Sequence, residues 1–320
     1  MNDYNVKIKE IAKQILKEKV CLNFTDISRF TTGTGHSVFY VKTYDDKEYV
    51  LRITADEIVD HYKGSLYWLK KLDELDILVP QILANGTYKN VHYVLMSYIN
   101  GKDLGDVYHT LNDNQKHSIA KEIVKIQNKL KKLPQAKGYG YACSVNDTKY
   151  SSWFEVIISI IERARGRIEC NKVFNSSICD EVIEYSEKFR DYFNNINPIT
   201  FLDDTTTKNV LINEEGAFVG IVDIDIVCFG DVLLTVGLTN MALLNMSLDT
   251  KYIDYLLKEM NVNDIQRKVV KYYTLLFCID FMAEQNMSFI NGNEVNANLE
   301  KTEQLKKIYN NLKKELENQK

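Results

Sequence analysis

The chain has 320 residues, a formal net charge of -4 and a pI near 5.8. Hydrophobic residues make up 45% and charged residues 26%, which is typical of a globular protein, and three prolines are too few for a collagen-like or proline-rich chain. A protein that binds nucleic acid over its whole surface would be basic, so that class is excluded. The longest apolar stretch, 231–244, is too short to span a bilayer, and the opening residues show no apolar signal segment. We therefore expect no nucleic-acid or membrane partner and a cytoplasmic location.

Cysteine and histidine spacing gives no metal-binding signature. The six cysteines form no C-x-x-C pair and have no histidine beside them at ligand spacing, so we expect small core residues and no structural zinc. The five histidines are predicted to be surface or packing residues. His36, in a glycine-rich turn, is the one that merits a test.

Patterns typical of strands dominate before residue 100. They predict a helix, a β-hairpin, a second helix and two further strands, at 4–18, 38–43 with 49–53, 62–75, 81–87 and 91–99. After Asn100-Gly101 the periodicity becomes helical. It predicts helices at 103–109, 113–132, 151–169, 177–194 and over most of 232–320, with a short hairpin at 210–212 and 217–222. The sequence thus predicts an α+β chain, with a β-rich unit at 1–98 and a mainly helical unit at 99–320.

Two features of the first unit suggest a nucleotide. Gly33 and Gly35 lie in a tight turn between strands, where glycines let backbone N–H groups approach a polyphosphate, and Ser37 could add a hydroxyl. An ordinary hairpin turn explains the same residues, and no P-loop lysine follows. Arg52 closes an apolar strand, either as a surface residue or as a fixed charge for the phosphates.

The segment 201–231 carries the strongest chemical signal. Asp204 precedes Asn209 by five positions at the start of the hairpin, and Asp223 follows its second strand. Asn209 and Asp223 offer the hard oxygen ligands that Mg²⁺ prefers, and Asp204 can accept a proton from a hydroxyl nucleophile. The alternative is a set of turn and cap aspartates around a plain hairpin.

This spacing resembles that of the aminoglycoside phosphotransferase family. The family pattern is His-Gly-Asp-x-x-x-x-Asn, a hairpin, Ile-Asp-Trp and then Gly-Asp-Pro. The chain has Leu202-Asp203-Asp204, Asn209, Val222-Asp223-Ile224 and Gly230-Asp231-Val232 at the same spacing. The resemblance implies the bilobal protein-kinase-like fold, with a small β-rich N-terminal lobe and a large helical C-terminal lobe. It also implies transfer of the γ-phosphate of ATP or GTP, with Mg²⁺, to a small-molecule acceptor.

The resemblance also implies roles for individual residues. Asp204 is similar to the catalytic base, Asn209 and Asp223 to the Mg²⁺ ligands, and Asp231 to an aspartate that caps the next helix. Lys208 stands where tyrosine kinases keep an arginine near the transferred phosphate. The implied nucleotide-binding residues are Gly33, Gly35, Ser37, Arg52 and, at the hinge that meets adenine, Met96, Ser97 and Tyr98.

Three departures from the family pattern leave room for an inactive nucleotide-binding relative. Leu202 replaces the usual histidine, Arg52 replaces the strand lysine, and the helix at 62–75 has no well-placed glutamate to orient that cation.

The acceptor is predicted to be a small, cationic molecule. Asp280 and Glu284 lie four positions apart on a helix expected over Tyr272–Met287, and Glu155 lies on the helix at 151–169. An aminoglycoside fits these acids, as does choline, and a sugar or macrolide stays open. Solvated helix surface is the alternative for all three residues.

Overall fold

The computed structural model describes residues 3–30, 35–286 and 298–318. These residues form two compact units. The first holds the chain up to Asn100 together with Gly220–Ile226. The second holds Gly101–Val219 and most of the chain after Val227.

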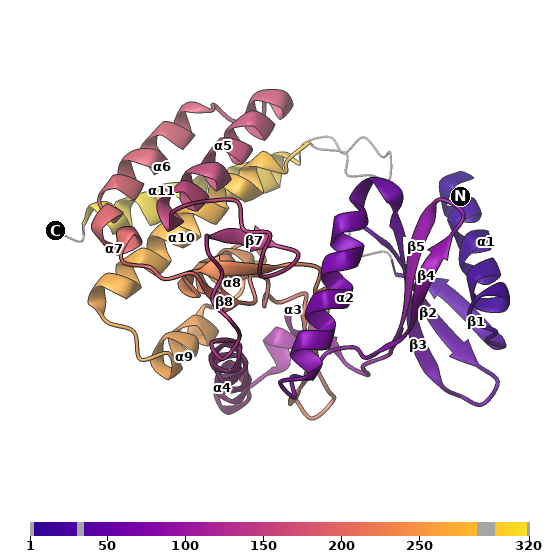
Figure 1. Ribbon diagram of the computed structural model, residues 1–320. Helices are drawn as coiled ribbons and strands as arrows, with labels where there is room; N and C mark the ends of the chain where they lie inside the picture. The colour runs from indigo at the N-terminus through magenta and orange to yellow at the C-terminus, as the bar shows by residue number, and fades with distance from the viewer. Residues whose placement is uncertain (1–2, 31–34, 287–297, 319–320) are drawn as a thin grey trace. The chain divides into compact units, whose positions relative to one another are not determined.

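The first unit is a five-stranded antiparallel sheet with one helix on each face (Figure 1). The strand order is β1-β2-β3-β5-β4. The elements are α1 (Asp3–Glu18), β1 (Phe24–Arg29), β2 (Ser37–Thr43), β3 (Glu48–Ala55), α2 (Val59–Asp73), β4 (Ile82–Tyr88) and β5 (Val91–Ser97), with one 3-10 turn at Asp56–Ile58.

The alternation of side chains along β3 places Arg52 on the face of the sheet opposite to α1. Leu51 and Ile53 belong to the buried core that includes Ile15 and Leu16 of α1. Since successive side chains of a strand point to opposite faces, Arg52 and Thr54 face away from α1. Arg52 is 4% exposed and therefore lies buried on the face that α2 covers.

The second unit is mainly helical and contains two three-stranded sheets, in the orders β10-β9-β6 and β7-β11-β8. Its strands are β6 (Lys102–Asp103), β7 (Gly140–Ala142), β8 (Ile199–Phe201), β9 (Val210–Ile212), β10 (Phe218–Ile221, whose end belongs to the first unit) and β11 (Val227–Gly230). Its helices are α3 (Leu104–Val107), a 3-10 turn at Tyr108–Thr110, α4 (Asp113–Leu130), α5 (Trp153–Asn171), α6 (Ser177–Glu187), α7 (Arg190–Asn194), α8 (Leu233–Asn245), α9 (Lys251–Glu259), α10 (Asp264–Ala283) and α11 (Leu299–Glu317).

The α+β class is confirmed, and most predicted elements are present within a few residues. The helix predicted over 177–194 is two helices, α6 and α7. The helix expected over Tyr272–Met287 begins earlier, as α10, and Met287 lies outside the described residues. The sequence did not predict the sheet of β7, β11 and β8, whose strands are three or four residues long.

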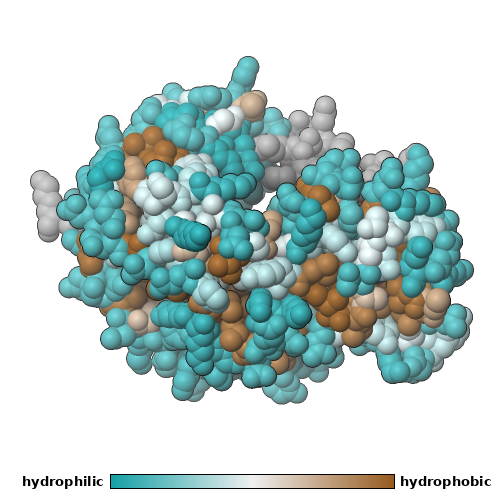
Figure 2. Space-filling model, in the orientation of Figure 1, coloured by the Kyte–Doolittle hydropathy of each residue, from teal (hydrophilic) through white to brown (hydrophobic). Residues whose placement is uncertain are grey.

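The face of the molecule shown in Figure 2 is mainly hydrophilic, with hydrophobic residues in separate patches. The exposed large hydrophobic residues include Val6, Tyr44, Leu83 and Leu299, which lie in different parts of the chain. None of the helices in the described part of the chain is long and apolar enough to cross a membrane.

Candidate functional site

The loop from Leu202 to Val210 holds Asp204 in a defined position. The Thr206 hydroxyl donates to Asp204 Oδ1 at 2.6 Å, and the Thr206 backbone N–H donates to the same oxygen at 3.3 Å. Asn209 Nδ2 donates to the Asp204 carbonyl oxygen at 3.2 Å. Asp204 itself is exposed while Thr206 and Asn209 are buried. The loop therefore presents one fixed carboxylate to solvent, as a general base requires.

The side chain of Gln127 supports this loop at Leu202, the position where the family pattern has a histidine. Its Nε2 donates to the Leu202 carbonyl at 2.9 Å, and its Oε1 accepts from the Leu202 N–H at 3.0 Å. Both side chains are buried, with Gln127 2% and Leu202 3% exposed. Leu202 thus packs in the core while a side chain of α4 satisfies both of its backbone groups.

Replacing Gln127 with leucine is expected to lower the free energy of unfolding by about 2 kcal/mol, because two buried backbone groups lose their partners. We expect kcat to fall by about 10-fold as well, since the loop carrying Asp204 loses its brace. Urea unfolding and steady-state kinetics measure the two effects. The exposed neighbour Asn128 is the matched control, and Asn128→Leu is expected to change neither. A Gln127→Leu protein of parental stability would show that the brace is dispensable.

Asp223 and Asn209 have the chemistry of magnesium ligands. Asp223 is exposed and has a φ of 62°, in the left-handed region that non-glycine residues avoid. Such conformations cost about 1–3 kcal/mol and occur at functional sites as well as at turns, where aspartate adopts them more readily than most residues. The nitrogen of the Asn209 amide is bound to Asp204, so its oxygen is the atom that remains for a cation. A carboxylate oxygen and an amide oxygen are both ligand types that Mg²⁺ accepts.

Asp231 is a structural residue, as the sequence predicted. Its Oδ1 accepts from the N–H of Leu233, the first residue of α8, at 3.0 Å. Its Oδ2 accepts from the hydroxyls of Tyr192 and Tyr273, both at 2.9 Å. Burial raises the pKa of Asp231 above its ordinary value, although these hydrogen bonds oppose the rise. Tyr273 also accepts from Trp153 Nε1 at 2.7 Å, so this hydrogen-bond network connects Asp231 to α5.

Arg52 has a partner in α2 that the sequence did not reveal. Its Nη1 contacts Asp225 Oδ1 at 2.5 Å, and its Nη2 donates to the hydroxyl of Ser65. Ser65 is fully buried on α2. A serine of the helix and an aspartate that follows β10 therefore orient the cation, in place of the absent glutamate.

Asp225 also contacts two histidines, His36, which the sequence had singled out for a test, and His61, which lies at the surface as predicted. His36 Nε2 lies 2.5 Å from Asp225 Oδ2, and His61 Nδ1 lies 3.7 Å from the same oxygen. Burial alone would raise the pKa of Asp225, but the Arg52 guanidinium and the two imidazoles outweigh it and hold the pKa well below its usual range. These partners lie far from Asp225 in the sequence, so no local pattern could show them.

The structure describes most of the predicted nucleotide-binding residues. Gly33 lies outside the described residues, and Gly35 is exposed, with no atom within 4 Å of the place that a Cβ would take. The buried Ser37 hydroxyl accepts from Arg29 Nη2 at 3.2 Å. At the predicted hinge, the Ser97 N–H donates to the Gln81 carbonyl at 2.9 Å, Met96 is buried, and the Tyr98 ring contacts Tyr40 edge-on.

The predicted acceptor residues fall into two groups. Asp280 contacts Arg163 at 3.2 Å and Arg167 at 3.8 Å. Burial and the nearby Asp280 raise the pKa of Glu284, whereas Arg167 and Lys208 oppose the rise, so Glu284 lies in the same electrostatic environment as Lys208 of the loop at 202–210. Glu155 is engaged elsewhere, because the N–H and the hydroxyl of Ser151 both donate to it at 2.8 Å at the start of α5.

The ionisation of Asp103, near Lys208, is expected to affect the stability of the protein. Burial raises the pKa of Asp103 to about 6, with Asp106 adding to the rise and Lys208 opposing it. The native chain therefore binds this proton more tightly than the unfolded chain, and stability falls as the pH rises from about 4 to about 6. Since the residue is only half-buried, Asp103→Asn is expected to raise the free energy of unfolding by about 1 kcal/mol at about pH 7 and by much less at about pH 4.

Urea unfolding at both pH values checks the Asp103 prediction. The exposed Asp106 is the matched control, and Asp106→Asn is expected to have little effect at either pH. A gain for Asp103→Asn that is equal at both pH values would contradict the assignment to ionisation.

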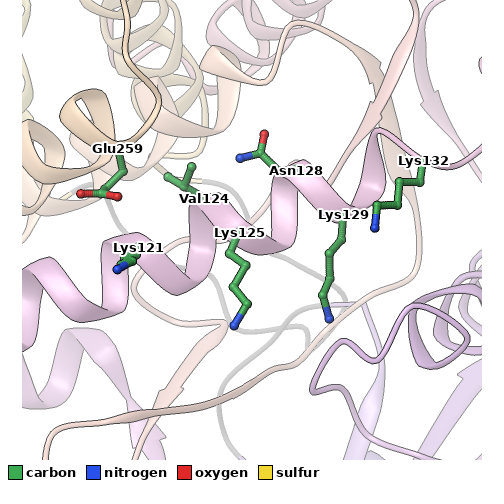
Figure 3. A pocket seen from close by; sticks show the side chains of 7 residues that line it. All are labelled: Lys121, Val124, Lys125, Asn128, Lys129, Lys132 and Glu259. Atoms are coloured by element: carbon green, nitrogen blue, oxygen red, sulfur yellow. The ribbon is translucent and has the colours of Figure 1, made fainter.

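A shallow hollow on α4 contributes nothing to this chemistry. Figure 3 shows its lining of Val124, Asn128, Glu259 and four lysines, namely Lys121, Lys125, Lys129 and Lys132. Lys125 pairs with Glu122 on its own helix, and Glu259 pairs with His117. None of the predicted site residues lines it.

Comparison with known proteins identifies the fold. Residues 26–154 match the model of the phosphotransferase enzyme family. The GDP complex of wild-type aminoglycoside 2'-phosphotransferase-IIIa matches with a TM-score of 0.70 and 14% identity, over 95% of this chain and 98% of that one. The chain has the aminoglycoside phosphotransferase fold. The fold implied by the resemblance at residues 202–232 is therefore confirmed, and the family model matches a different part of the chain, residues 26–154.

Two further structures share this fold with the chain. A thermostable mutant of aminoglycoside phosphotransferase APH(4)-Ia in its apo form has a TM-score of 0.69 and 16% identity, over 94% of this chain and 98% of that one. Amicoumacin kinase hAmiN, in complex with AMP-PNP, Ca²⁺ and Ami, has a TM-score of 0.66 and 11% identity, over 98% of this chain and 96% of that one. No curated protein sequence matches the chain.

Proposed function

We propose that the chain is a cytoplasmic, Mg²⁺-dependent phosphotransferase that moves the γ-phosphate of ATP or GTP to a hydroxyl of a small, cationic molecule. The observation that carries this proposal is the loop in which Thr206 and Asn209 fix the exposed Asp204. Asp204 accepts the proton of the acceptor hydroxyl, and Asn209 and Asp223 hold Mg²⁺. The ion neutralises charge on the phosphates, and the protein contributes mainly position and electrostatics.

The phosphate donor binds to the first unit. Gly35, Ser37 and Arg52 contact the phosphates, and the backbone of Met96–Tyr98 meets the base. Gly33, also predicted to bind, lies outside the described residues. Arg52 is already paired with Asp225 at 2.5 Å, so a phosphate shares this cation with a carboxylate. Lys208 supplies a further positive charge from the catalytic loop. Either GTP or ATP can be the phosphate donor in this proposal, because structures with the same fold have been solved with GDP and with AMP-PNP.

An aminoglycoside is the acceptor that we favour, which would make the activity one of antibiotic resistance. Glu284 and Asp280 offer carboxylates to amino groups, although Asp280 is shared with Arg163. An ammonium group beside Glu284 would lower its raised pKa and gain a charge-assisted contact. Choline, sugars and macrolides are the alternative acceptors, and amicoumacin kinase shows that the fold is not restricted to one antibiotic class.

The test is a transfer assay on the purified chain with Mg²⁺ and either ATP or GTP. The acceptor panel consists of aminoglycosides, choline-like amines, macrolides and sugars, and mass spectrometry detects a product that has gained one phosphate. We expect transfer to an aminoglycoside. Nucleotide-dependent thermal stabilisation without transfer to any acceptor would instead indicate an inactive nucleotide-binding relative. Absence of Mg²⁺-dependent nucleotide binding would contradict both.

A further inference from the structure

Two histidines and an aspartate from three separate elements converge in the first unit. His36 precedes β2, His61 belongs to α2, and Asp225 follows β10. One ligand atom from each lies within 4.8 Å of the other two. We propose that His36, His61 and Asp225 bind a first-row divalent transition metal ion of the Zn²⁺ type, at a site distinct from the Mg²⁺ ligands Asn209 and Asp223.

The surrounding residues orient these ligand atoms as a metal site requires. Thr54 Oγ1 lies 3.0 Å from His36 Nδ1, which leaves Nε2 directed toward Asp225. Arg52 holds Asp225 Oδ1, so that Oδ2 is the oxygen facing both imidazoles. Metal-binding histidines and carboxylates are typically fixed by such second contacts.

The ligand atoms lie close enough for an ion after rotation of the side chains. Ligand atoms around a tetrahedral Zn²⁺ ion lie about 3.3 Å apart when each metal bond is about 2.0–2.1 Å. His61 Nδ1 is 3.7 Å from Asp225 Oδ2, and all three ligand atoms lie within 4.8 Å of one another, so the imidazole side chains need to rotate to surround an ion. His36 Nε2 is 2.5 Å from the same oxygen, a hydrogen bond whose proton the ion would replace.

Burial leaves the site with one open side. The side chains of His36 and Asp225 are 7% and 12% exposed, whereas that of His61 is 47% exposed and provides an entry path. Imidazole nitrogen selects Zn²⁺, Co²⁺ or Ni²⁺ over Mg²⁺, which prefers oxygen alone. Three protein ligands leave a fourth position for water or for an anion.

Cobalt titration of the metal-free, full-length chain without nucleotide tests the proposal. We expect one Co²⁺ per chain, a visible absorption band from nitrogen and oxygen ligands, displacement by Zn²⁺ and no displacement by excess Mg²⁺. His61→Gln and His36→Gln are each expected to weaken cobalt binding at least about 10-fold. Thr54→Val, which removes only the contact of Thr54 with His36 Nδ1, is expected to weaken it by about 10-fold.

His92 is the matched control, because its Nε2 contacts Asp56 at 2.9 Å and its Nδ1 contacts Thr87, yet it lies outside the three-ligand group. His92→Gln is expected to leave cobalt binding unchanged, and circular dichroism checks that each variant is folded. Binding that survives both His36→Gln and His61→Gln, or a sulfur-to-cobalt charge-transfer band, would overturn the proposal. So would the absence of any cobalt binding, which would leave the cluster an ion-pair network around Asp225. These results do not depend on phosphate transfer.

Discussion

Replacing Asp204 with asparagine is expected to lower kcat by about 10²–10⁴-fold, because the loop then presents an amide that cannot accept the acceptor proton. Asparagine keeps the size of the side chain and one oxygen for the contact from Thr206, which is 2.6 Å in the parent chain. We therefore expect the fold and the KM for nucleotide to change little.

Asp203→Asn is the matched control for this loss. Asp203 is the adjacent acid of the same loop, but it lies outside the Asp204–Asn209 spacing. Its replacement is expected to cost less than about 10-fold in kcat. Steady-state kinetics with the acceptor identified in the panel measures both variants. An Asp204→Asn enzyme within a few-fold of the parent would exclude Asp204 as the base.

Replacing Arg52 with methionine is expected to lower the free energy of unfolding by about 3–5 kcal/mol, since the buried carboxylate of Asp225 then loses its positively charged partner. The side chains of the pair are only 4% and 12% exposed, so solvent screens it weakly. Arg52→Lys keeps the charge but loses the contact to Ser65, so a smaller loss is expected. The double variant Arg52→Met with Asp225→Leu removes both charges and is expected to recover most of the loss.

The pH dependence of this effect follows from the lowered pKa of Asp225. A carboxyl whose folded pKa is depressed contributes stability that is fully present above its unfolded pKa, near 4, and is lost as the pH falls toward the folded value. The difference between the parent and Arg52→Met should therefore be largest at about pH 7 and shrink in acid.

Urea unfolding of the first unit can be followed through Trp68 of α2. The chain has two tryptophans, so Trp153→Phe, made in the parent and in each variant, leaves Trp68 as the reporter. A loss below about 1 kcal/mol for Arg52→Met would show that the histidines suffice to stabilise Asp225.

The sequence predicted the parts of the protein that short patterns determine. Apolar spacing located α1 and the hairpin of β2 and β3, and the spacing of Asp204, Asn209 and Asp223 pointed to the family whose model matches residues 26–154. Each of these signals lies within a few tens of residues. The roles assigned to individual residues by that spacing remain proposals.

The missed features depend on contacts between distant residues. Gln127 braces Leu202 across 75 positions, and Arg52 and His36 meet Asp225 across 173 and 189 positions. A glutamine inside an amphipathic helix, or a histidine in a polar turn, has no local signature of such a partner. The sheet of β7, β11 and β8 was missed for the same reason, because its short strands are defined by pairing and not by a repeated pattern.

A crystal structure of the chain with Mg²⁺ and a non-hydrolysable ATP analogue tests the proposed chemistry most directly. We predict an ion bound by Asn209 Oδ1 and a carboxylate oxygen of Asp223 at about 2.0–2.1 Å, with Asp204 near the γ-phosphate and not bonded to the ion. An ion held by other residues, or an Asn209 and Asp223 too far apart to share one, would contradict the assignment of this chain as a phosphotransferase.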